Sequence, residues 1–169
     1  MKASFRSNRR FMQSVETGYT VYYNLRHRTV GRLFQGRYGA KLVDGDDYLM
    51  KLSRYIHLNP VFTARMKAMP RGQRISSLRD YRWSSYRSYV GLAKELKYVT
   101  YGPVLAQMGG RTGQRKRLYR EFVEGGIAGA DDEFMEALKT SPHAIGGDDF
   151  LAWARDAYLQ LAEKQETSE

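Results

Sequence analysis

The hydrophobic positions of this chain repeat mostly at the three-to-four-residue spacing of an α-helix. The spacing predicts helices over residues 5–25 and 47–59, and a short one that starts near residue 84 and ends at residue 91. Further along, the pattern predicts short helices separated by glycines, over residues 103–108, 113–124, 131–139 and 148–164. Residues 33–43 instead have the composition of a strand, with a bulge expected at Gly36 or Gly39. We therefore expect an α+β fold that is mostly helical.

Length and composition narrow the class of protein. A chain of 169 residues suits one domain, or one domain with a small appendage. No apolar run approaches the roughly 20 residues that cross a bilayer, and the N-terminal residues lack the apolar stretch of a secretory signal. The absence of cysteine excludes disulfides and thiolate metal sites. These features predict a cytoplasmic protein that is not a membrane protein.

The net charge of +10 is unevenly distributed. Residues 1–91 hold 18 Lys and Arg against 5 Asp and Glu, whereas residues 92–169 hold 10 against 13. Fourteen of the 18 basic residues are arginine, and nine of the 13 tyrosines lie in the same half. Arginines interleaved with flat aromatic rings suit a surface that holds a phosphate backbone and stacks unpaired bases. The charge shift predicts two domains, 1–91 and 92–169, of which the first binds nucleic acid.

The segment 48–60 contains the candidate chemistry. On a helix, Tyr55 and Asn59 are four residues apart and project from one face, with Arg54 one position before the tyrosine. A phenol beside a carboxamide is compatible with a nucleophile next to a metal ligand. It is equally compatible with a buried tyrosine that hydrogen-bonds an asparagine at the helix end. The residues alone leave both interpretations open.

Three blocks of sequence resemble a known family. Residues 31–38 (GRLFQGRY), 47–61 (DYLMKLSRYIHLNPV) and 81–91 (YRWSSYRSYVG) are similar in order and spacing to blocks of the REP-associated tyrosine transposases, within the HUH single-tyrosine transposase superfamily. Residues 19–24 (YTVYYN) resemble the block before them. The resemblance covers roughly residues 5–91. It implies the C-terminal half of a ferredoxin-like HUH domain, and the later helices look like the extension of longer members.

The resemblance also implies roles. Tyr55 occupies the position of the nucleophile that attacks a DNA phosphodiester, and Asn59 a position that usually supplies a third ligand to Mg²⁺ or Mn²⁺. The family cuts and rejoins single-stranded DNA at hairpin-bearing repeats, a form of DNA transposition and recombination, and its members often work as homodimers. The residues expected to contact DNA are Arg26, Arg28, Arg32, Arg37, Lys41, Arg54, Arg82 and Arg87.

The metal motif of the family is not found in this sequence. The family holds its ion on two histidines that flank one hydrophobic residue, but no two of His27, His57 and His143 have that spacing. The strands that carry the pair in the family are also not recognised, which suggests a truncated gene or a start codon further upstream. The aspartates at positions 44, 46 and 47 are compatible with a cation site, although capping of the next helix fits them better. We therefore expect this chain to bind no metal and not to cleave DNA.

Two functions of different classes follow. The first is a transposase-like enzyme with Tyr55 as its nucleophile. The second is a catalytically inactive nucleic-acid-binding module that keeps the basic surface of residues 1–91.

Overall fold

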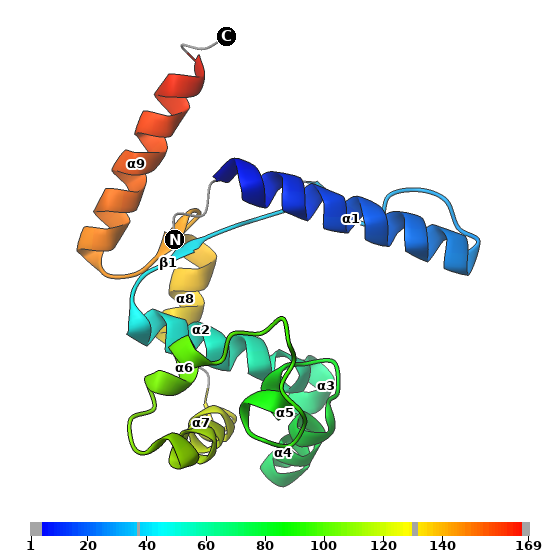
Figure 1. Ribbon diagram of the computed structural model, residues 1–169, viewed down its shortest axis with the longest axis vertical. Helices are drawn as coiled ribbons and strands as arrows, with labels where there is room; N and C mark the ends of the chain where they lie inside the picture. Colours follow the sequence, from blue (N-terminus) through cyan, green and yellow to red (C-terminus); the bar gives the residue numbers. More distant parts are fainter. Residues whose placement is uncertain (1–4, 37, 130–131, 167–169) are drawn as a thin grey trace. The chain divides into compact units, whose positions relative to one another are not determined.

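The structure is a computed structural model that describes residues 5–36, 38–129 and 132–166. It is mostly helical with one small parallel sheet, as the hydrophobic pattern predicts (Figure 1). The chain forms two compact units, residues 1–40 and 41–169. In the described part of the chain, no helix is long and apolar enough to span a bilayer.

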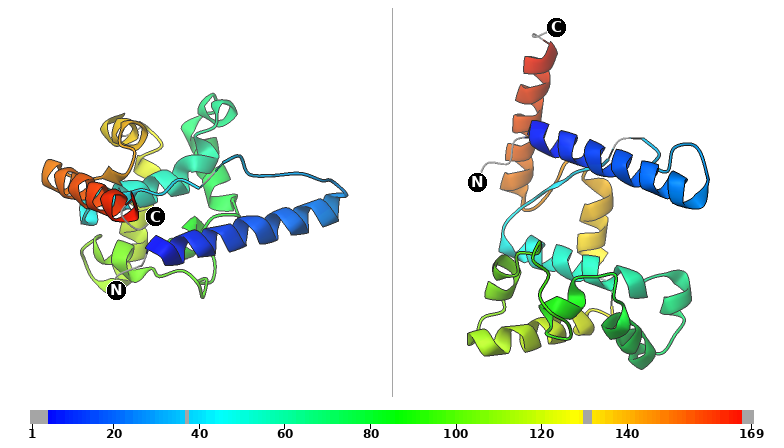
Figure 2. Two further views of the ribbon diagram at one scale, coloured as in Figure 1. Left: turned by 90° about the horizontal axis from the view of Figure 1, so that it is seen from above. Right: turned by 45° about the vertical axis from the view of Figure 1, so that its right-hand side comes forward.

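The first unit consists of helix α1 (Phe5–His27) and the segment that follows it. The helix ends at Arg28, which takes a left-handed backbone conformation with φ of 54°. The segment then folds back along α1, as both views of Figure 2 show. The Asn24 side chain donates to the Gly31 carbonyl over 2.9 Å, and the Phe34 ring lies 6.1 Å from that of Tyr19.

The strand predicted over residues 33–43 is wrong over most of its length. Only Leu42–Val43 form a strand, β1, whereas the described residues before them are irregular, with Gly36 at a φ of 80° that a strand does not allow. β1 pairs in parallel with β2 (Ala144–Ile145), with Leu42 opposite Ala144. The pairing partner of β1 therefore lies about 100 residues further along the same chain.

The described part of the second unit contains eight helical segments before its final helix. They are α2 (Asp46–Leu58), the 3₁₀ turn η1 (Asn59–Val61), α3 (Ala64–Lys67), α4 (Arg71–Asp80), α5 (Tyr86–Tyr89), α6 (Gly102–Ala106), α7 (Thr112–Gly125) and α8 (Asp132–Thr140). The final helix, α9 (Asp148–Glu166), follows β2. The helices predicted over 103–108, 113–124, 131–139 and 148–164 are confirmed to within a few residues at each end.

The core of the second unit is assembled around α2. Its buried apolar residues come from α2, η1, α4, α5, α6 and α7, namely Met50, Leu58, Val61, Leu78, Tyr86, Tyr89, Val90, Val104, Leu105, Tyr119, Val123 and Ile127. Because these residues come from both sides of residue 91, the boundary predicted there from the charge shift falls inside one packed unit. The change in net charge near residue 91 therefore does not mark a boundary between two packed cores.

An ion pair between Arg79 and Glu124 links α4 to α7 beside the core. Glu124 accepts two hydrogen bonds of 2.7 Å from the guanidinium of Arg79 and a third of 2.9 Å from the Tyr86 hydroxyl. Burial alone would raise the pKa of Glu124, but the bonds from Arg79 and Tyr86 outweigh it and lower that pKa. Burial and the neighbouring carboxylate both raise the pKa of Tyr86. Helices α4, α5 and α7 are thereby joined at one point.

Candidate functional site

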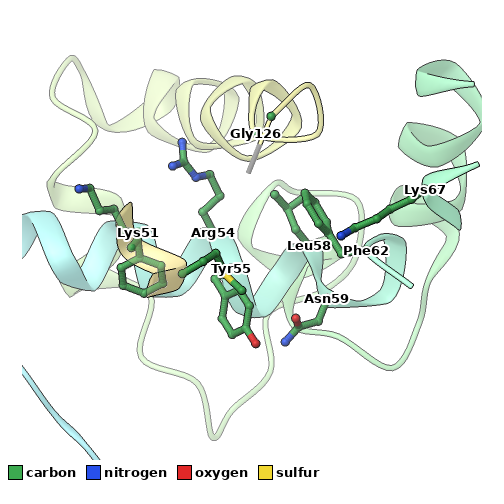
Figure 3. A pocket seen from close by; sticks show the side chains of 11 residues that line it. Lys51, Arg54, Tyr55, Leu58, Asn59, Phe62, Lys67 and Gly126 are labelled. Atoms are coloured by element: carbon green, nitrogen blue, oxygen red, sulfur yellow. The ribbon is translucent and has the colours of Figure 1, made fainter. Parts of the chain in front are cut away.

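Helix α2 presents Tyr55 and Asn59 on one side, as their spacing predicts. The helix starts with Asp46 and Asp47 in its first turn, where negative charge favours the N-terminus. It ends because Pro60 lacks an amide hydrogen and opens η1. The backbone N–H of Asn59 still donates to the Tyr55 carbonyl, so helical geometry extends to Asn59. Figure 3 shows the Tyr55 hydroxyl and the Asn59 amide pointing to the same side of the helix.

These two side chains line a pocket of about 260 Å³, called the Tyr55 pocket below. Its lining residues are Lys51, Arg54, Tyr55, Leu58, Asn59, Phe62, Lys67, Gly126, Gly129, Phe134 and Met135. Tyr55 is half-buried, and its ring lies 6.2 Å from that of Phe134 on α8. Among these described residues, the charged side chains are the three cations Lys51, Arg54 and Lys67. The pocket therefore combines aromatic walls with three positive charges.

Arg54 is held in place by the end of α7. Its guanidinium carbon lies 4.7 Å from the centre of the Phe122 ring, a cation–π contact. Gly126 approaches its stem so closely that a β-carbon at residue 126 would lie 2.8 Å from Arg54 Cδ. Figure 3 shows the side chain extending toward Gly126, away from the Tyr55 hydroxyl. Arg54 therefore supplies positive charge to the pocket from a packed position.

The opposite face of α2 carries a buried polar cluster. His57 is 3% exposed, and its Nδ1 lies 2.7 Å from the Tyr119 hydroxyl while its Nε2 lies 3.0 Å from the Ser85 hydroxyl. The hydroxyl of Ser53, one turn before His57, lies 2.5 Å from that of Tyr119. Burial lowers the pKa of His57 to about 4, so the ring is neutral at physiological pH. This cluster fixes the rotation of α2 and thereby directs Tyr55 into its pocket.

None of the three histidines lines the Tyr55 pocket. His57 faces the core, as its position two residues after Tyr55 predicts. His27 packs on Tyr23 and His143 stacks on Tyr158, each with ring centres 4.2 Å apart. All three rings are therefore engaged with other aromatic side chains in the described chain.

The lining of the pocket does not fit a divalent cation. Mg²⁺ and Mn²⁺ prefer oxygen ligands, above all carboxylates, and the side chains of the described lining offer one carboxamide and one phenol. The three nearby cations would repel the ion. Within the described residues, no group of three or more His, Cys, Asp or Glu could hold a metal. Asp46 and Asp47 lie in the first turn of α2, while an Asp44 carboxylate oxygen accepts from the Gly147 N–H over 3.4 Å.

The other residues predicted to contact DNA fall into separate places. Arg26 and Arg28 are exposed at the end of α1, and the exposed Arg32 lines a hollow beside that helix. Arg37 lies outside the described residues. Lys41 donates to the Leu138 carbonyl on α8, so it ties the start of β1 to that helix. Within the second unit, Arg54 lines the Tyr55 pocket and Lys41 does not.

Arg82 and Arg87 lie together in a second hollow of the same unit. The guanidinium carbon of Arg82 is 5.1 Å from the centre of the exposed Trp83 ring, and both arginines line a groove around α5. The two arginines were predicted from the sequence, but the groove was not. Its second wall comes from residues 93–99, and local sequence patterns do not show that these residues pack near α5.

Two cations of the Tyr55 pocket were missed by the sequence analysis. Lys51 precedes Tyr55 by four residues and could have been found from helical spacing. Lys67 could not, because the turn after Pro60 and the short helix α3 bring it back to the pocket. The Thr63 side chain caps α3 by accepting from the Met66 N–H.

Comparison of the chain with protein-family models, with curated proteins and with solved structures gave no significant match.

Proposed function

We propose that this chain is a DNA-binding, transposase-like protein that holds a backbone phosphate of an unpaired strand in the Tyr55 pocket. The observation that carries the proposal is the lining itself, in which Lys51, Arg54 and Lys67 line one pocket with a tyrosine that the sequence blocks align with a transposase nucleophile. A phosphodiester brings one negative charge and several acceptor oxygens. The ammonium groups, the guanidinium and the Asn59 amide are all donors of the kind that bind it.

An unpaired strand fits this pocket better than a duplex. The half-buried Tyr55 offers a ring surface next to the cations, and a base can stack on a ring only when it is free of its partner strand. The basic, tyrosine-rich half of the chain favours the same ligand. On this proposal, α2 and the segments before it are the part of an HUH domain that carries the tyrosine.

The same lining favours binding without cleavage. Attack by a phenol on a phosphodiester needs its proton removed and the developing charge on the leaving oxygen stabilised. Among the lining residues that the structure describes, none carries a carboxylate or imidazole to accept the proton, and their donor set does not fit the divalent ion of the family. We therefore favour the DNA-binding module over the active transposase.

The test is the binding of a fluorescein-labelled hairpin with a single-stranded tail, followed by anisotropy. Wild-type protein should bind this DNA more tightly than a duplex of equal length, with affinity that falls steeply as salt rises. The double variant Lys51→Gln/Lys67→Gln should bind at least tenfold more weakly, because two phosphate contacts are lost. Lys139→Gln on α8 removes an exposed cation outside the pocket and serves as the control. Equal affinity for hairpin and duplex, or no loss in the double variant, would overturn the proposal.

A further inference from the structure

A second groove lies in the same unit as the Tyr55 pocket. It has a volume of about 510 Å³ and is called the Trp83 groove below. One wall comes from residues 82–88 around the start of α5, and the other from residues 93–99 in the loop before α6. The lining residues are Arg82, Trp83, Ser84, Ser85, Arg87, Ser88, Ala93, Lys94, Leu96, Tyr98 and Val99.

Two aromatic rings stand at this groove with most of their surface in solvent. Trp83 is 76% exposed and Tyr98 is 84% exposed, one from each wall. A tryptophan usually buries most of its large apolar surface, so this degree of exposure leaves ring faces free for a ligand. The contact between Trp83 and the Arg82 guanidinium holds a cation directly beside one of those faces. The groove thus offers flat apolar surfaces next to positive charge.

The charges of the groove are uniform. Its charged lining residues are Arg82, Arg87 and Lys94, and none is acidic. Glu95, next to Lys94, is instead paired with Lys116 of α7 over 2.8 Å. An acidic ligand with flat rings is the chemistry that matches both features.

The groove is attached to the same core as the Tyr55 pocket. Ser85 lines the groove, and its hydroxyl bonds the imidazole of His57 on the inner face of α2. Ser88 also lines it, accepts from the Tyr101 hydroxyl over 2.9 Å and donates to the Ser85 carbonyl over 2.7 Å. Hydrogen bonds of Ser85 and Ser88 therefore hold the floor of the groove in place, and the bond from Ser85 to His57 connects it to α2.

We infer that the Trp83 groove is a second binding site, which takes unpaired nucleotides of a DNA strand by stacking bases on Trp83 and Tyr98 and pairing phosphates with Arg82, Arg87 and Lys94. The choice of DNA as the strand rests on the proposed function. In a single strand, flat bases alternate with phosphates that each carry one negative charge. The two walls of the groove likewise offer aromatic rings next to cations. The site lies outside the Tyr55 pocket and shares no lining residue with it.

The first test uses the two tryptophans of the chain as separate reporters. Trp153→Phe leaves Trp83 as the single tryptophan, and Trp83→Phe leaves Trp153 on α9. Titration with a thymidine oligonucleotide should quench Trp83 fluorescence in parallel with the rise in anisotropy of the labelled strand, whereas Trp153 should stay unquenched. Stacking of a base on the indole ring predicts this difference.

The second test measures affinity. Trp83→Ala and Tyr98→Ala should each weaken binding of the oligonucleotide by about five- to a hundredfold, the range found when one stacking ring is removed. Tyr158→Ala on α9 removes another exposed ring and is the matched control. Because the rings of Trp83 and Tyr98 are exposed, their removal leaves the core intact.

The outcomes separate this inference from the proposed function. If the strand binds without quenching Trp83, and Trp83→Ala binds with wild-type affinity, the Trp83 groove is not a binding site. That result leaves the proposal for the Tyr55 pocket unaffected. Loss in Trp83→Ala but not in Lys51→Gln/Lys67→Gln supports the groove and overturns the pocket. Tighter binding of RNA of the same sequence, or of an acidic peptide, overturns the assignment to DNA. No binding of any single strand by the wild-type protein overturns both.

Discussion

Gly126 lies against Arg54 with no room for a side chain between them. A β-carbon at residue 126 would stand 2.8 Å from Arg54 Cδ and 3.1 Å from Leu58 Cδ1. The end of α7 can therefore approach α2 only because residue 126 is glycine. The φ of Gly126 is −66°, an ordinary value for any residue, so the need for glycine here is a matter of space and not of backbone conformation.

We expect Gly126→Ala to push Arg54 out of its position over Phe122. The free energy of unfolding should fall by about 1–3 kcal/mol, as for other overpacked sites, and single-stranded DNA should bind several-fold more weakly. Gly129→Ala is the control, because Gly129 lines the same pocket and a β-carbon there would meet no atom within 4 Å. Urea unfolding and anisotropy measure the two effects. Equal behaviour of the two alanine variants would refute the packing role of Gly126.

The second prediction concerns Glu124, which joins α4, α5 and α7. Glu124→Gln should lower the free energy of unfolding by about 1–3 kcal/mol, because the charged bonds from Arg79 are weakened inside the core. Glu121→Gln, in an exposed pair with Arg117, should change it by less than about 0.5 kcal/mol. The pKa of Glu124 is lowered, so its stabilisation is present above the ordinary glutamate pKa and is lost as pH falls through the lowered value. Urea titrations at neutral and acid pH test both statements.

His57 predicts a second pH dependence, at higher pH. Its pKa is about 4 when folded and 6.5 when unfolded, so the unfolded chain binds the extra proton between these values. Stability should be full above pH 6.5 and should fall by about 2 kcal/mol by pH 5. The rings of Tyr86, Tyr89 and Tyr119 surround the imidazole and provide no negative charge at these pH values to offset the loss.

The control for this prediction is the exposed His143. His57→Gln should flatten the dependence between pH 6.5 and pH 5, although it also costs hydrogen bonds to Tyr119 and Ser85. His143→Gln should leave the dependence as it is in the wild-type protein. A slope that persists in His57→Gln would assign the proton to another group.

The features of the fold and of the site that could be predicted from the sequence are those that depend on residues close together in the chain. The shared face of Tyr55 and Asn59 follows from helical spacing, and so does the inward direction of His57. The arrival of Lys67 in the pocket depends on a turn after Pro60, and the partner of β1 lies about 100 residues away. Residues 33–41 have the composition of a strand, but Gly36 takes a φ that extended backbone does not allow. Local periodicity does not encode such long-range pairings or turns.

The fourth prediction is negative for metal and for cleavage. Mg²⁺ or Mn²⁺ at millimolar concentration should leave the thermal midpoint of residues 1–169 unchanged, because the charged side chains in the described lining of the pocket are cations. Labelled hairpin DNA incubated with the protein and either ion should be recovered intact on a denaturing gel. A covalent adduct that is lost in Tyr55→Phe would show that the chain holds a catalytic site with other ligands.

The most direct test of the central claim locates the bound strand on the protein. Single-stranded DNA carrying 5-bromodeoxyuridine is cross-linked by light to the ring it stacks on, and the attachment is mapped after trypsin digestion. If a strand occupies the Tyr55 pocket, the tryptic fragment 55–65 carries the cross-link, and Lys51→Gln/Lys67→Gln, but not Lys139→Gln, reduces it. Cross-links that leave fragment 55–65 unmodified while the strand is bound would contradict the account.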